Sequence, residues 1–132
     1  MAVWGRTFGR VWGRVFGEID AVPAAPSNLI ASATGSTTIA LIWDDNSNNE
    51  DGFRIERAAA EDGPFNEIDT VAADVELYED TGLTPETTYY YRVIATSGEL
   101  DSDFSNVANA TTLGNENRYA HRYYFQQIKA GV

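Results

Sequence analysis

The chain has 132 residues, no cysteine, one histidine and a formal net charge of −11. The lack of cysteine excludes disulfides, zinc thiolates and cysteine nucleophiles, and a single histidine leaves little for metal clusters or serine–histidine–aspartate triads. A hydrophobic fraction of 43% is enough for the packed core of one domain. We therefore expect a small non-catalytic protein with no cofactor and no metal.

The charge is unevenly distributed along the chain. Residues 20–113 carry 18 acids and three bases, a formal charge of −15, whereas residues 1–19 and 114–132 each carry +2. Nucleic-acid binding rests on cationic contacts to phosphate, so the acidic middle should repel nucleic acid and no such partner is expected. No apolar stretch approaches the ~20 residues of a membrane span, and arginines interrupt the apolar run that a secretory signal needs. We expect neither a membrane partner nor an export signal of the usual kind.

The N-terminal segment, residues 1–21, contains a four-residue repeat that reads VWGR, TFGR, VWGR, VFGE. In a helix the aromatics form one stripe, the arginines lie nearly opposite and the glycines form a bare line. In an extended ribbon the aromatics and arginines would share one face. The helix is favoured, although its four glycines cost about 3–4 kcal/mol relative to alanine, and both conformations need a partner surface. The predicted anchor residues are the aromatics Trp4, Phe8, Trp12 and Phe16, the glycines Gly5, Gly9, Gly13 and Gly17, and the arginines Arg6, Arg10 and Arg14.

From Pro26 onward, short alternating runs separated by turn residues predict antiparallel β structure. The fold class is all-β: a seven-stranded antiparallel Greek-key sandwich over residues 22–113 with short extensions at both ends. The seven strands are expected over Asn28–Ala33, Thr37–Trp43, Phe53–Arg57, Phe65–Val71, Val75–Tyr78, Thr88–Thr96 and Ser105–Thr112.

Trp43 at the end of the second strand, EDGFRIER from Glu50, YEDTGLTPETTYYYRV from Tyr78 and SNVANATT from Ser105 carry a family resemblance. Together they resemble a bacterial-type fibronectin type III domain over about residues 22–113. The resemblance implies a corner in which a tyrosine hydroxyl ties back to the preceding loop. It also implies that this module is a non-catalytic spacer, adhesion unit or display platform. The implied core positions are Trp43, Tyr78, Leu83, Tyr89 and Val93, with Tyr89 as the corner tyrosine and Pro85 shaping the turn.

The loop between the second and third strands, Asp44–Asp51, is dense in carboxylate and amide oxygens. Such oxygens suit Ca²⁺, but the loop lacks the EF-hand spacing. Asp and Asn are also ordinary turn-forming residues. The favoured interpretation is a solvated loop without a metal.

The C-terminal tail, residues 114–132, mixes aromatic and basic residues. Aromatics with arginine are enriched in the cores of protein interfaces. Docking on another subunit is favoured, packing on the same chain is the alternative, and stacking on single-stranded nucleic acid is disfavoured by the acidic domain. Neither terminal segment resembles a known family. The predicted contact residues are Tyr119, Arg122, Tyr123 and Phe125.

These features predict a structural display protein whose terminal segments fasten an acidic module to protein subunits of a larger, symmetric assembly. The assembly expected is a bacteriophage virion, with the chain as a capsid decoration, neck or tail component. Weak contact of the exposed loops with glycans is also expected. The alternative is a membrane-associated or exported adhesion or carbohydrate-binding module at the bacterial cell surface, for which the arginine-opposed aromatic face provides an argument.

Overall fold

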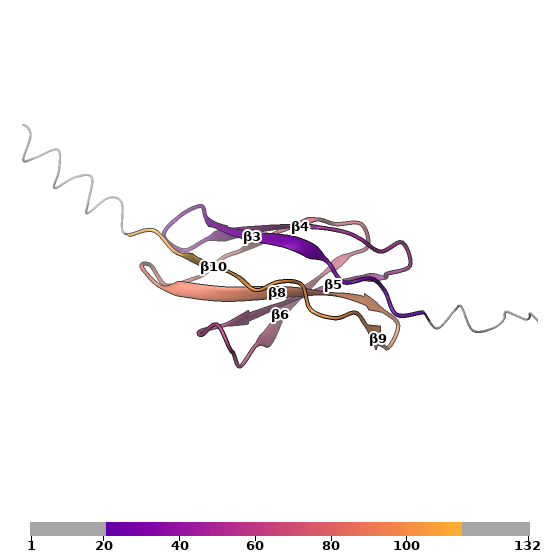
Figure 1. Ribbon diagram of the computed structural model, residues 1–132. Coiled ribbons are helices and arrows are strands. Elements are labelled where there is room, and N and C mark those ends of the chain that lie inside the picture. Colours follow the sequence, from indigo (N-terminus) through magenta and orange to yellow (C-terminus); the bar gives the residue numbers. More distant parts are fainter. Residues whose placement is uncertain (1–20, 115–132) are drawn as a thin grey trace, which may run out of the picture.

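Alternating burial along short strands assembles residues 21–114, which the computed structural model describes, into two facing β-sheets (Figure 1). The predicted N-terminal helix and both terminal segments lie outside the described residues. The smaller sheet consists of β3 (Ser27–Ala33), β4 (Ile39–Asp44) and β7 (Leu77–Asp80). The larger sheet consists of β10 (Ala108–Thr111), β8 (Thr88–Ser97), β5 (Gly52–Ala58) and β6 (Asn66–Ala72), with the two-residue β9 (Leu100–Asp101) paired to β8.

Every strand pair is antiparallel, and the order is β3-β4-β7 in one sheet and β10-β8-β5-β6 in the other. The chain changes sheets after β4 and returns after β6, so that β7 lies beside β4 rather than beside its predecessor β6. This crossing over between layers is the Greek-key arrangement that the strand pattern predicts. The all-β sandwich is therefore confirmed.

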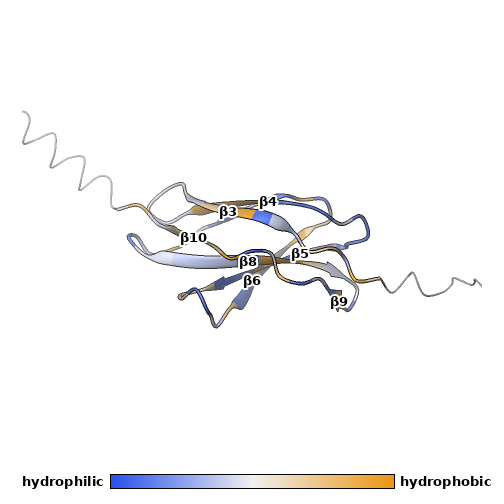
Figure 2. Ribbon diagram, viewed as in Figure 1, coloured by the Kyte–Doolittle hydropathy of each residue, from blue (hydrophilic) through white to orange (hydrophobic). Residues whose placement is uncertain are grey.

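The core lies between the sheets and is built by the inward residues of each strand. On β4, Ile39, Leu41 and Trp43 are at most 3% exposed while the residues between them point outward. The Trp43 ring meets the Phe53 ring of β5 edge to face, with centroids 5.6 Å apart. That geometry is one that aromatic pairs prefer. The hydropathy colouring in Figure 2 shows the mixture of hydrophobic and hydrophilic residues along the strands that such alternation produces.

Each of the seven predicted strands differs from its observed bounds by one to three residues at one or both ends, and two of these differences have a local cause. The expected strand from Val75 instead starts at Leu77, because Asp74 takes a left-handed φ of 67° and the amide of Val75 bonds back to the carbonyl of Ala72 in a turn. The last strand starts at Ala108 rather than Ser105. There the Ser105 hydroxyl accepts the amide of Val93, so a side chain takes the place of a ladder bond.

The two ends of the described chain lie at opposite ends of the sandwich (Figure 1). At one end, Asn49 donates its side-chain amide to the carbonyl of Ala21. At the other, the amide of Leu113 bonds to the carbonyl of Gly35 in the turn between β3 and β4. Among the described residues no helix is long and apolar enough to cross a membrane.

Candidate functional site

The tyrosine corner lies between β7 and β8. Gly82 has a φ of 72°, which turns the chain so that the amide of Leu83 bonds to the carbonyl of Thr37. The hydroxyl of Tyr89, five residues after Thr84, accepts the amide of Thr84 at 3.1 Å. Of the residues that the resemblance places in the core, Trp43, Leu83 and Val93 are buried, while Tyr78 and Tyr89 pack at the margin of the core.

A charged network bridges the two sheets next to this corner. Arg57 on β5 and Asp80 on β7 form an ion pair of 2.8 Å, and the hydroxyl of the fully buried Tyr91 donates to the same carboxylate oxygen at 2.8 Å. Burial raises the pKa of the Tyr91 hydroxyl, and the hydrogen bond to Asp80 raises it further. Burial tends to lower the pKa of Arg57, but pairing with Asp80 outweighs this and raises it.

The neighbouring Tyr78 behaves in the same way. Burial and the carboxylate of Asp69, to which its hydroxyl donates, raise the pKa of Tyr78 to about 12. Tyr78 and Tyr91 therefore both keep their protons at neutral pH and are not available as general bases. The network fastens the two sheets together.

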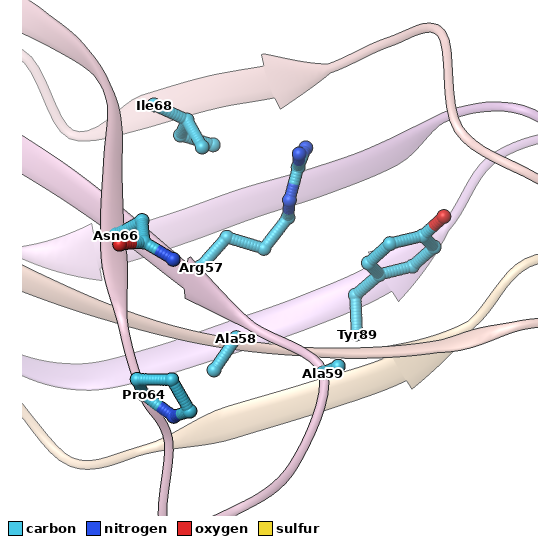
Figure 3. A pocket seen from close by; sticks show the side chains of 7 residues that line it. All are labelled: Arg57, Ala58, Ala59, Pro64, Asn66, Ile68 and Tyr89. Carbon is cyan, nitrogen blue, oxygen red and sulfur yellow. The ribbon is translucent and has the colours of Figure 1, made fainter.

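A pocket of about 340 Å³ opens beside the network on the β5–β6 hairpin (Figure 3). The Arg57 side chain extends between Ile68 and Tyr89 in this view, and the Arg57 guanidinium carbon lies 5.4 Å from the centre of the Tyr89 ring. Only Arg57 and Tyr89 of the seven lining residues are ionisable, and each is already bonded, to Asp80 and to the backbone of Thr84. The pocket thus offers no nucleophile with an adjacent base. Its lining residues are Arg57, Ala58, Ala59, Pro64, Asn66, Ile68 and Tyr89.

The outer face of the larger sheet carries an arginine held between two aromatic rings. The Arg92 guanidinium carbon lies 3.5 Å from the centre of the Phe104 ring and 4.3 Å from that of Phe65. Glu56, 9% exposed, accepts Arg92 Nε at 2.7 Å and Arg54 Nε at 3.2 Å. Phe104 is 52% exposed, so its ring faces solvent on one side and the Arg92 guanidinium on the other.

Three carboxylates converge at the end of the sandwich where the described chain begins. Asp45, Glu50 and Asp74 each have an oxygen within 4.8 Å of those of the other two. Asp45 and Glu50 come from the acidic loop noted in the sequence, and the turn before β7 adds Asp74, which sequence reasoning missed. Oxygen ligands of this kind are those that hold Ca²⁺ in proteins.

The pKa values of Asp45 and Glu50 in this cluster are shifted in opposite directions. Burial raises the pKa of Asp45, against a hydrogen bond from the Ser47 amide, and the neighbouring carboxylates raise it further. Burial also acts to raise the pKa of Glu50, but hydrogen bonds from backbone amides, including that of Asp74, and from Asp45 outweigh it, so that the pKa of Glu50 is lowered. Of these two carboxyls Asp45 is therefore protonated first as the pH falls, and the protonated Asp45 can donate a hydrogen bond to Glu50.

The predicted anchor residues of the repeat (Trp4, Phe8, Trp12, Phe16, Gly5, Gly9, Gly13, Gly17, Arg6, Arg10 and Arg14) lie outside the described residues, as do Tyr119, Arg122, Tyr123 and Phe125 of the tail. The arrangements that the sequence did not indicate are those joining distant strands: Asp74 with Asp45, and Phe65 with Phe104 around Arg92. For the stack of Arg92 with Phe65 and Phe104, the sequence indicated only that Arg92 points outward, because it alternates with the inward Tyr91 and Val93.

A two-sheet antiparallel sandwich with a tyrosine corner defines a β-sandwich module of the immunoglobulin-like class. The chain belongs to the fibronectin type III family, because the profile of the fibronectin type III domain matches residues 24–111. The resemblance predicted from the sequence motifs is therefore confirmed. The fibronectin type III fold is that of a non-catalytic module.

Relatives of known name contain the module as a small part of a long chain. Receptor-type tyrosine-protein phosphatase F of Mus musculus is 38% identical over 79 residues, which are 58% of this chain and 4% of the phosphatase. An amylopullulanase of Thermoanaerobacterium saccharolyticum is 33% identical over 85 residues, 64% of this chain and 7% of the enzyme. The chain thus spans less than a tenth of the length of these relatives.

Solved structures agree with the fold. An Fn3-like protein from Clostridium thermocellum superposes with a TM-score of 0.62 at 28% identity, covering 73% of this chain and 99% of that protein. The FN5 domain of Drosophila Lar gives a TM-score of 0.58 at 28% identity, covering 71% of this chain and all of that domain.

Proposed function

We propose that the chain is a non-catalytic structural module that holds two partner-binding terminal segments at opposite ends of an acidic spacer. The observation that carries this proposal is the position of Ala21 and Leu113, which are bonded to loops at opposite ends of the sandwich. Segments attached there reach partners on both sides of the module. In this proposal the contacts of Asp80 with Arg57 and Tyr91 keep the module rigid. The module itself performs no reaction.

The larger assembly in this proposal is a bacteriophage particle, in which the repeat with Trp4 and Trp12 and the tail with Tyr123 fasten the module to capsid, neck or tail subunits. Its support is the combination of a fibronectin type III module with two short segments in which aromatic residues are mixed with basic ones. Aromatic residues next to arginine favour protein interfaces. The acidic surface of the module stays exposed and keeps the particle soluble.

Phage particles purified from a culture that produces the chain test this proposal directly. The measurement is the amount of the chain in purified particles, for the wild type and for the variant Trp4→Ala/Trp12→Ala. The matched control is Phe104→Ala, which removes an exposed aromatic from the module itself. We expect the double variant to be lost from particles and the control to be retained. A chain absent from purified particles refutes the virion, and undiminished incorporation of the double variant refutes the anchor.

The second candidate function is an adhesion or carbohydrate-binding module, and the Phe104 stack favours it. Exposed aromatic rings are surfaces on which sugar rings pack, and Arg54 and Asp101 supply polar groups on the same face. The amylopullulanase relatives bear a name that denotes action on starch-type glucans. Retention of the chain on insoluble starch, abolished by Phe104→Ala and unaffected by Tyr90→Phe, would support this function. Equal elution of wild type and Phe104→Ala would exclude it.

A further inference from the structure

The outer face of the smaller sheet carries three exposed aliphatic side chains in one continuous row. Ile30 on β3 pairs with Ile42 on β4, and Ile42 pairs with Leu77 on β7. Their exposed fractions are 52%, 51% and 65%. Side chains directly opposite on neighbouring strands have Cβ atoms ~5 Å apart, so these three form a single apolar surface across all the strands of the sheet. We call them the Ile30–Ile42–Leu77 row.

This row has an acidic border. Asp44 lies two residues beyond Ile42 on the same strand, Glu79 lies two residues beyond Leu77, and Glu76 precedes Leu77. All three are exposed, and β3, β4 and β7 contain no lysine, arginine or histidine. A contiguous apolar patch with a polar rim marks a protein contact. The border selects a partner that brings apolar side chains together with positive charge, and it disfavours a second copy packed row to row, because like charges would then face each other.

We propose that the occupant of the Ile30–Ile42–Leu77 row is the chain's own C-terminal segment, residues 118–125. This segment contains four aromatics among seven consecutive residues, together with Arg118 and Arg122. The N-terminal repeat spreads its four aromatics from Trp4 to Phe16 with a glycine after each. Both segments contain arginines, and the C-terminal segment offers the denser apolar surface.

The place where the described chain ends makes this contact reachable. Leu113 bonds to Gly35, at the end of the sheet where β3 finishes. Ile30 lies five residues back from Gly35, which is about 17 Å along a strand. Residues 119–125 follow Gly114 by five to eleven positions and span up to roughly 17–36 Å of extended chain. The segment can thus pass Glu79 first and reach the row next, and tethering raises its effective concentration over that of any free copy.

The proposal is independent of the assembly proposed above, because it concerns the isolated chain. If both hold, the C-terminal segment leaves its own sheet when a partner subunit offers a better surface. If only the cis contact holds, the row is simply covered by residues 118–125 and the repeat remains as the anchor. Failure of one is therefore visible without failure of the other.

Hydrogen–deuterium exchange of the full chain, read by mass spectrometry on peptides from residues 115–132, tests the contact. We expect these amides to exchange at least about tenfold more slowly than in the isolated peptide, the ratio that 1.4 kcal/mol provides. The variant Ile42→Thr/Leu77→Thr should return exchange to within twofold of the peptide. The matched control is Val107→Thr, an exposed aliphatic at 39% in the segment that precedes β10 of the other sheet, which should leave protection unchanged.

Charge reversal provides a second variant that leaves the apolar row intact. Glu79→Lys should lose most of the protection at low salt, whereas Glu67→Lys on β6 should lose none. Unprotected wild-type amides, or protection insensitive to both the threonine pair and Glu79→Lys, would overturn the proposal. Protection that disappears on dilution would assign the row to a second copy, and protection of residues 3–17 in place of 118–125 would assign it to the repeat; either result overturns it too.

Discussion

Removing either partner of the Arg57–Asp80 ion pair should destabilise the module, and the two losses should be unequal. The pair joins β5 of one sheet to β7 of the other at 2.8 Å. At this distance the gross Coulomb attraction is about 6 kcal/mol for an effective dielectric constant of 20. Most of that attraction only offsets the cost of taking two charges out of water. What a single substitution measures is therefore the cost of the charge that is left behind.

The exposures of the two side chains decide the order of the losses. The Asp80 side chain is 6% exposed, whereas the Arg57 side chain is 32% exposed and reaches solvent. Arg57→Met leaves a buried carboxylate with only the Tyr91 hydroxyl as donor, for which we expect a loss of about 3 kcal/mol. Asp80→Asn leaves a guanidinium that water can still solvate, for which we expect about 1–2 kcal/mol.

Urea denaturation of the full chain at pH 7, followed by tryptophan fluorescence, measures both losses. The matched control is Asp103→Asn, the same chemical change at an exposed loop position, which should shift the free energy of unfolding by no more than about 0.5 kcal/mol. Met is close to the length of the arginine stem and keeps its apolar packing, whereas the guanidinium contact with the Tyr89 ring is lost and is part of the expected loss. Losses in the reverse order, or both within the range of the control, would refute the assignment of the ion pair as the fastening between the sheets.

Three further outcomes follow from single contacts. Tyr89→Phe removes the acceptor of the Thr84 amide and should cost about 1 kcal/mol, a fall in melting temperature of roughly 4–8 °C, while Tyr90→Phe should cost much less. Gly52→Ala should cost roughly 1–3 kcal/mol in urea denaturation, because a Cβ there meets the carbonyl oxygen of Val71 on β6. Asp45→Asn should stabilise the module at pH 7 by about 1 kcal/mol, because the carboxylate oxygens lie within 4.8 Å of one another and two charges at that separation already repel by about 0.9 kcal/mol in water. The folded state binds a proton on Asp45 more tightly than the unfolded state does, so thermal scans should show this gain shrinking as the pH falls through the raised pKa of Asp45.

How much of the module the sequence predicts depends on how local each feature is. The inward residues of β4 and β8 follow from alternation within one strand, and the tyrosine corner spans only a few residues, so both are legible in the sequence. The start of β7 is not, because it depends on the left-handed conformation of Asp74, which the residue type permits but does not require. Alternation from Val75 fits the pattern equally well.

The candidate surfaces were harder to predict, since each is made by pairing between strands. Ile30, Ile42 and Leu77 are ordinary outward positions in three separate strands, and only the register places them side by side. Phe65 and Phe104 lie in the segments that precede β6 and β10, and they meet at Arg92 of β8 only when the larger sheet is assembled. Registers of this kind are set by packing of the whole sandwich, which no single segment encodes.

All three arginines of the module form ion pairs within it, so a basic partner for the acids on its smaller sheet has to come from outside the module. Residues 21–114 contain three bases, and each is committed within the module: Arg54 to Glu56 and Asp101, Arg92 to Glu56, and Arg57 to Asp80. The carboxylates that border the Ile30–Ile42–Leu77 row, Asp44, Glu76 and Glu79, have no ion pair with a basic side chain of the described residues. Counter-charge that is specific in position must then come from the terminal segments or from a partner. The outer face of the smaller sheet, which has acids and no base, is where such a cation gains the most, because there it also covers apolar surface.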